Sequence, residues 1–160
     1  MGKQKLLRRR DIICGVCISS AENKQIAEKF IDEIFNKGNL DEVSRFVTSD
    51  FLYHARGEDV TGIESFKEWI SSDRNVFPDI RFTILDSISE FNKVATAWIV
   101  EATHTKEFRG IPPTQKKFET AGVNFFHFED NKIKEAWAVV DGLTAALQIG
   151  VVKTESSETR

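Results

Sequence analysis

Apolar residues recur at helical spacing in the first half of the chain and alternate with polar residues in the second half. The capping-box pattern Ser19–Glu22 is followed by an apolar stripe that ends at Asn36–Asn39, which predicts a first helix. The stripe consists of Ile26, Ala27, Phe30, Ile31, Ile34 and Phe35. Similar spacing predicts further helices over residues 40–47 and 62–71, with a short strand over residues 51–55 between them.

The period changes to two after Phe77-Pro78. Strand-like alternation begins at Phe82 and continues through a segment in which Trp98, Ala102 and His104 share one parity. Two more strands are predicted over residues 118–128 and 133–141, joined by a turn at 129–132, and residues 142–150 form a terminal helical turn. Helices followed by strands indicate an α+β fold. We expect three N-terminal helices on a curved, mainly antiparallel sheet, forming a cone with an apolar pocket.

The length of 160 residues suggests one folded domain, which we place at residues 21–150. Residues 1–20 are predicted to be a partly disordered N-terminal arm, and residues 151–160 a flexible tail. The chain contains 13 Phe but a single Tyr, a composition that suits an apolar, cavity-lined interior.

Charge argues against a nucleic-acid partner. Residues 1–10 carry five Lys and Arg, so the remainder holds 17 Lys and Arg against 25 Asp and Glu, a net charge of −8. Such an acidic body is a poor binder of phosphate backbones. The basic start followed by residues 12–18 imitates a signal peptide, but the apolar run is short and lacks a clear cleavage site. No stretch reaches the length of a membrane span, and we expect a cytoplasmic protein with no membrane partner.

Cys14 and Cys17 form a C-x-x-C pattern, which is compatible with a redox pair or with half of a zinc site. No second pair of Cys or His follows at ligand spacing, and the three histidines show no H-x-H or H-x-x-x-H pattern. We therefore interpret the cysteines as small apolar side chains and predict neither a metal nor a cofactor.

Candidate acid–base residues lie on the strand-like segments. Asp141 follows an apolar strand and is the predicted general base, because a poorly hydrated carboxylate has a raised pKa. His104 is predicted to donate a proton or hydrogen bond to the substrate oxygen, and His54 to orient the substrate. We expect the substrate to contact a further set of side chains: Tyr53, Trp98, Asn124, Phe126, Glu135 and Trp137.

Each candidate also has a structural interpretation. Asp141 beside Gly142 is equally compatible with a helix cap. His104 also suits an ordinary strand position and His54 a loop, while a cross-strand charge pair would explain Glu135.

With these residues in view, the chain resembles the SnoaL-like polyketide cyclase (ester cyclase) group of the NTF2-like superfamily. The resemblance spans roughly residues 21–150 and includes Tyr53-His54 with Gly62, Thr103-His104 and Phe108–Thr114. It continues through Trp137-Ala138-Val139-Val140-Asp141 to Gly150. Family members often have His before this Trp and Asp after it, where this chain has Ala136 and Ala138.

The resemblance implies a cone with a deep apolar pocket, a homodimer packed through the sheet, and proton abstraction next to a carbonyl without metal or cofactor. It places Asp141, His104 and His54 in the pocket. The function we expect is aldol cyclisation or isomerisation of a polyketide-like or other apolar substrate. The alternatives are a non-catalytic binding module for an apolar small molecule, a hydratase or dehydratase, and a dimerising scaffold.

Overall fold

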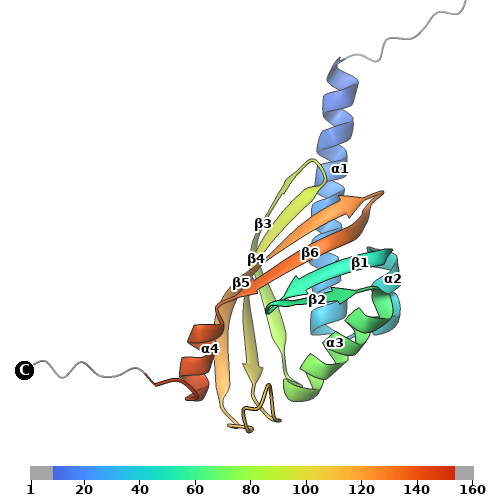
Figure 1. Ribbon diagram of the computed structural model, residues 1–160. Helices are drawn as coiled ribbons and strands as arrows, with labels where there is room; N and C mark the ends of the chain where they lie inside the picture. Colours follow the sequence, from blue (N-terminus) through green and yellow to red (C-terminus); the bar gives the residue numbers. More distant parts are fainter. Residues whose placement is uncertain (1–8, 154–160) are drawn as a thin grey trace, which may run out of the picture.

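The computed structural model describes residues 9–153, with side chains from residue 20 onward. The chain forms short and long helices around one sheet (Figure 1). The helical elements are α1 (Arg9–Phe30), η1 (Ile31–Asn36), η2 (Leu40–Glu42), α2 (Val43–Phe46), α3 (Ile63–Val76) and α4 (Gly142–Ile149). The strands are β1 (Val47–Ala55), β2 (Glu58–Thr61), β3 (Arg81–Glu90), β4 (Lys93–Thr103), β5 (Lys117–Glu129) and β6 (Lys132–Val140).

The sheet has the strand order β2-β1-β6-β5-β4-β3. Strands β3 to β6 form an antiparallel meander, and β1 joins it by pairing in parallel with β6. The sheet is strongly curved and does not close into a barrel (Figure 1). The predicted α+β architecture, with helices on a curved and mainly antiparallel sheet, is confirmed.

The inner face of the sheet is filled by aromatic rings around Phe30 of α1. This side chain packs edge-on against Phe51 of β1 and Phe126 of β5, and it stacks on Phe66 of α3. One ring thus holds two helices and two strands together, which explains part of the unusual phenylalanine content. Other phenylalanines line a cavity toward the opposite end of the sheet: Phe35, Phe77, Phe82, Phe108 and Phe118.

The helix boundaries differ from the prediction at two points. Helix α1 begins at Arg9, so the capping-box residues Ser19–Glu22 lie inside the helix, because the residues before them contain no proline to stop it. Cys14 and Cys17 therefore fall within α1, although their side chains lie outside the described part of the chain, as do residues 1–8 and 154–160. Helix α3 continues to Val76, five residues beyond the predicted end.

Two β-bulges change which residues face inward. In β3 the pairing shifts between Ile84 and Asp86, so Ile88 faces outward with 68% of its surface exposed. In β6 the pairing with β5 shifts between Ile133 and Glu135. Ile133 is buried, but beyond the bulge the inward positions are the even-numbered ones. Glu135 and Trp137 therefore do not share a face with Ile133.

Candidate functional site

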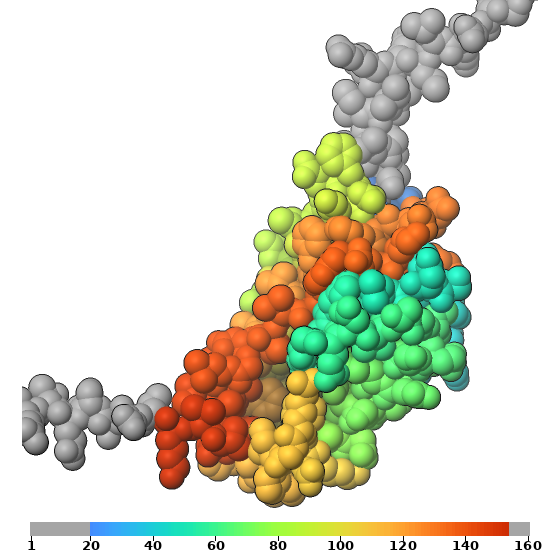
Figure 2. Space-filling view, viewed as in Figure 1, coloured from blue at the N-terminus to red at the C-terminus, as the bar shows by residue number. Residues whose placement is uncertain are grey.

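A cavity of about 230 Å³ opens at the end of the sheet that carries α4. It is bounded by the inner face of the sheet, by α3, by α4 and by the loop of residues 104–116. Figure 2 shows its mouth as a hollow between α4, this loop and the β1–β2 hairpin. The volume greatly exceeds the ~30 Å³ share of one liquid water. Most of the lining side chains are apolar, and the polar ones are Tyr53, Arg56, Asp73, Arg74, His104 and Thr120.

His104 lies at the cavity wall, as the parity of β4 predicted. It directly follows the strand, and its backbone bonds with Gln115 and Lys116 close the base of the loop. The side chain is only 1% exposed, and Phe77 packs against the ring.

The hydrogen bonds of His104 determine which ring nitrogen carries the proton. The backbone N–H of Thr114 donates to Nδ1 at 3.4 Å, and the Thr114 hydroxyl lies 3.2 Å from the same atom. Because a backbone N–H can only donate, Nδ1 is an acceptor and the neutral ring carries its proton on Nε2. Nε2 is buried and has no hydrogen-bond partner. The ring therefore presents an unpaired N–H donor at the wall of an apolar cavity.

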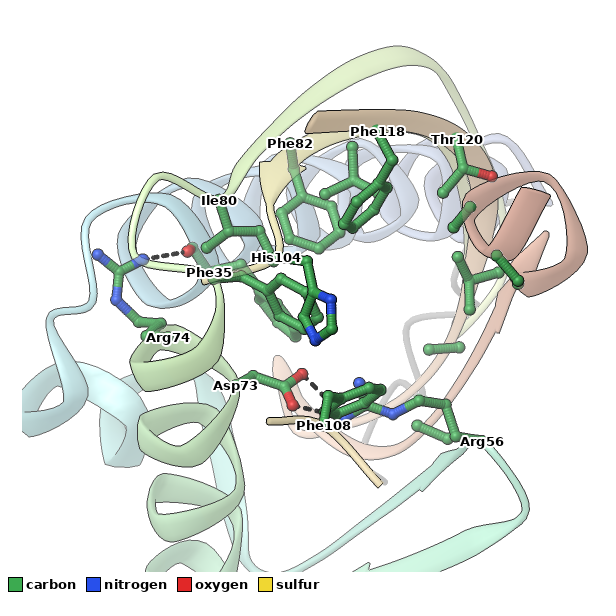
Figure 3. A pocket seen from close by; sticks show the side chains of 18 of the residues that line it. Phe35, Arg56, Asp73, Arg74, Ile80, Phe82, His104, Phe108, Phe118 and Thr120 are labelled. Carbon is green, nitrogen blue, oxygen red and sulfur yellow. Dashed lines mark hydrogen bonds and ion pairs between the residues drawn. The ribbon is translucent and has the colours of Figure 1, made fainter. Parts of the chain in front are cut away.

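Asp73 of α3 faces His104 across the cavity (Figure 3). Nη2 of Arg56 lies 2.9 and 2.8 Å from its two carboxylate oxygens. Burial raises the pKa of the Asp73 carboxyl above its ordinary value, and the Arg56 guanidinium acts in the opposite direction. The guanidinium itself lies 4.1 Å from the centre of the Trp69 ring, a cation–π distance.

Sequence reasoning missed this carboxylate, although a signal was present. Phe66, Trp69, Ile70, Asp73 and Phe77 follow the i, i+3, i+4 spacing of the buried face of α3. An acid on an apolar stripe is unusual and points to a partner or a function. Arg56 could not be found in this way, because it lies in the β1–β2 turn, with a φ of 54°, and so belongs to no helical or strand pattern of apolar residues.

The predicted substrate contacts on the inner face are only partly in the cavity. Tyr53 and Trp98 line it, and burial raises the pKa of the Tyr53 phenol well above its ordinary value. Asn124 lies beside the cavity and accepts a hydrogen bond from Trp98 Nε1 at 2.5 Å. Phe126 is part of the Phe30 cluster instead and does not line the cavity.

Asp141 does not lie in the cavity, and the expectation of a poorly hydrated carboxylate there is wrong. The side chain is exposed at the start of α4, where Oδ1 accepts from the Thr144 backbone N–H at 3.0 Å and Oδ2 from the Thr144 hydroxyl at 2.6 Å. These bonds hold the pKa of Asp141 below its ordinary value. The residue is the helix cap that the alternative interpretation described.

Glu135, Trp137 and His54 lie on the outer face of the sheet, contrary to prediction. The β6 bulge turns Glu135 and Trp137 outward, and His54 alternates with the inward residues Tyr53 and Ala55. The His54 ring stacks on Trp137, with 4.8 Å between ring centres.

These outward residues form a cluster of their own. His54 Nδ1 lies 2.6 Å from Asp59 and Nε2 lies 3.0 Å from Glu135, so both ring nitrogens donate to carboxylates when the ring is protonated. Burial would lower the pKa of His54, but the two carboxylates outweigh it and raise the value. His127 Nδ1 lies 3.4 Å from Glu135 on the same face. Among the side chains that the structure describes, those of residues 20–153, no group of three or more His, Cys, Asp or Glu has an arrangement that could hold a metal ion.

Comparison with known proteins agrees with this architecture. The profile of the SnoaL-like polyketide cyclase family matches residues 25–149. The chain belongs to this family. No curated protein matches the chain.

Among solved structures, the chain is similar to IdmH of Streptomyces antibioticus, a candidate polyketide cyclase. The two are 27% identical, with 79% of this chain and 99% of that chain covered and a TM-score of 0.68. A SnoaL-like protein of Jannaschia reaches a TM-score of 0.77 at 19% identity, covering 84% of this chain and 95% of its own. AclR of Streptomyces galilaeus, a candidate hydroxylase, has a TM-score of 0.72 at 22% identity, with 84% of this chain and 99% of AclR covered. At such identities these last two show the fold alone.

The fold shows where the two alanines beside Trp137 lie. Ala138 lines the cavity and Ala136 is buried beneath it, so an acid directly after the Trp would face the cavity. In this chain β6 contributes only apolar side chains to the lining.

No helix among the described residues has the length and apolarity needed to cross a membrane.

Proposed function

We propose that this SnoaL-like protein is a cofactor-independent enzyme that moves a proton next to the carbonyl group of an apolar substrate. The observation that carries the proposal is the buried, unpartnered Nε2–H of His104 at the cavity wall. An unsatisfied buried donor is costly, and it persists where a ligand completes the bond.

In this proposal a substrate carbonyl oxygen accepts a hydrogen bond from His104 Nε2. When a proton leaves the neighbouring carbon, the electron pair moves onto that oxygen, and the fixed donor stabilises the developing negative charge. Apolar walls exclude water and strengthen this interaction. The resulting enolate either attacks a second carbonyl, which gives aldol cyclisation, or takes up a proton at another carbon, which gives isomerisation. Membership of a cyclase family and the likeness to IdmH support this reaction class.

Exchange of α-protons for deuterium tests the proposal without knowledge of the natural substrate. β-Tetralone and ethyl acetoacetate are suitable compounds, because both carry acidic protons next to a carbonyl. Binding is measured by thermal shift and exchange by NMR in deuterated buffer. We expect the protein to accelerate exchange, and His104→Phe, which keeps a ring but has no N–H donor, to slow it by about 10²–10³-fold, the usual cost of losing one such donor.

The matched control is His127→Phe, which makes the same change to a histidine on the outer face of the sheet. This variant should exchange at the wild-type rate. If the wild-type protein binds these ketones without accelerating exchange, the proposed activity is wrong and the pocket is a binding site for apolar molecules. If His104→Phe retains the full rate, the role of Nε2 is wrong.

A further inference from the structure

Asp73 is the only carboxylate among the described residues that lines the cavity. The predicted base Asp141 and the predicted substrate contact Glu135 are excluded by position, since Asp141 caps α4 at the surface and Glu135 lies on the outer face. Ala138 leaves no acid at the inward position after Trp137. A proton acceptor in this cavity must therefore come from α3 rather than from the sheet.

The surroundings of Asp73 suit a base. Its side chain is 16% exposed, so it is largely shielded while still reaching the cavity. Burial favours the protonated form, which makes the carboxylate a stronger proton acceptor than an exposed one. Arg56 bonds to both oxygens through a single nitrogen, so each oxygen keeps a lone pair for another partner.

The position of the carboxylate is fixed from several sides. Arg56 approaches from the β1–β2 turn, and its guanidinium is held over the Trp69 ring, one helical turn before Asp73. Phe108 of the loop lies on another side of the guanidinium, at 5.4 Å. A purely structural ion pair between α3 and the hairpin would not need to face an unpartnered histidine donor. In Figure 3 the carboxylate and the His104 ring point into the same space.

We propose that Asp73 is the catalytic carboxylate of this protein, with Arg56 as its positioning residue. The assignment rests on the function proposed above. A substrate lying between the two side chains would direct its carbonyl oxygen to His104 Nε2 and the neighbouring C–H to Asp73. The carbon–hydrogen bond breaks, the proton passes to Asp73, and the electron pair moves onto the oxygen. Return of that proton to carbon or to the aldol oxygen restores the carboxylate, so no oxidant or cofactor is needed.

The first test is Asp73→Asn, which keeps the shape of the side chain but cannot accept the proton. We expect deuterium exchange of bound β-tetralone to fall by about 10²–10⁴-fold, the range for general-base catalysis, while binding by thermal shift persists. The control is Asp79→Asn. Asp79 accepts bonds from Thr103 at 2.7 and 2.6 Å and does not line the cavity, so its loss should leave exchange unchanged.

A pH profile separates catalysis from a structural role. The acid limb of the exchange rate should report the Asp73 carboxyl, because protonation removes the base. Replacing Arg56 with Gln removes the charge that lowers this pKa, so the acid limb should move to higher pH. The position of the acid limb in Arg56→Gln also tests the role of Asp73 as a base if Asp73→Asn fails to fold.

The outcomes distinguish the two proposals. If the wild type exchanges the proton and His104→Phe slows it, but Asp73→Asn exchanges at the wild-type rate, the role of Asp73 is overturned and the proposed function stands. An acid limb that does not move in Arg56→Gln also overturns it. If the wild type does not accelerate exchange, both proposals fail.

Discussion

Replacing Gly122 with Ala should destabilise the protein and disturb the cavity at the same time. Gly122 pairs with Trp98 across β4 and β5, and the indole ring occupies the space where a side chain would be. An added Cβ would lie 2.5 Å from Trp98 Cζ2 and 2.6 Å from the Val139 carbonyl oxygen, with Cη2 closer still. Both neighbours would have to move, and one of them is backbone of the adjacent strand.

The expected magnitude follows from these contacts. Overpacking costs about 1–3 kcal/mol, and the backbone contact places this site at the upper end of that range. Moving the indole also breaks its hydrogen bond with Asn124, which adds about 1 kcal/mol. For a chain of this length, 1 kcal/mol lowers the melting temperature by about 2–4 °C, so we expect a decrease of roughly 10 °C.

Thermal and urea unfolding measure the effect, and Gly142→Ala is the control. No atom lies within 4 Å of a Cβ added at Gly142, so this variant should melt like the wild type. Combining Gly122→Ala with Trp98→Phe removes the clashing indole atoms, so the double variant should lose less stability than the sum of the single variants. A melting temperature of Gly122→Ala equal to that of the wild type would refute the packing argument.

The remaining predictions concern residues outside the cavity. Asp141→Asn should keep the helix cap and the exchange rate, whereas Asp141→Ala should melt at a lower temperature than the wild type. Because the folded state lowers the pKa of Asp141, the difference in melting temperature between wild type and Asp141→Ala should disappear as the pH falls through that lowered pKa. The raised pKa of His54 means that its pairing with Asp59 and Glu135 stabilises the fold below its unfolded pKa of about 6.5. The stability lost in His54→Gln should thus shrink as the pH rises through the folded pKa, and a constant difference in urea unfolding would contradict this. The homodimer implied by the family resemblance stays a prediction. Val139 is 70% exposed on the outer face, so Val139→Glu should yield monomers by sedimentation, and a wild type that is already monomeric would contradict the dimer.

The fold could be predicted from local patterns because the spacing of apolar residues shows which side of a helix or strand must be buried. Helical spacing located α1 and α3, and the alternation along β4 correctly placed Trp98 and His104 on the inner face. Strand β4 allows this inference because it pairs with β5 without an irregularity from Lys93 to Thr103.

Strand β6 shows where the same reasoning fails. A single extra residue between Ile133 and Glu135 reverses the direction of every later side chain, and no turn residue or proline in the sequence marks it. Strict alternation from the buried Ile133 would place Glu135 and Trp137 in the pocket and Ala138 outside it, the reverse of what the structure shows. Whether the strand bulges depends on its pairing with β5 and, on the other side, with β1, which lies far away in the sequence.

The sequence by itself determined the class of fold, the inward position of His104 and the apolar character of the interior, since these depend on composition and local period. Only the tertiary structure decided which acid joins that histidine. Asp73 and Arg56 are 17 residues apart and meet because α3 folds back over the β1–β2 turn, while α4 withdraws Asp141 to the surface. Burial and pairing are properties of the packed chain, so the chemistry of a carboxylate cannot be assigned before its neighbours are known.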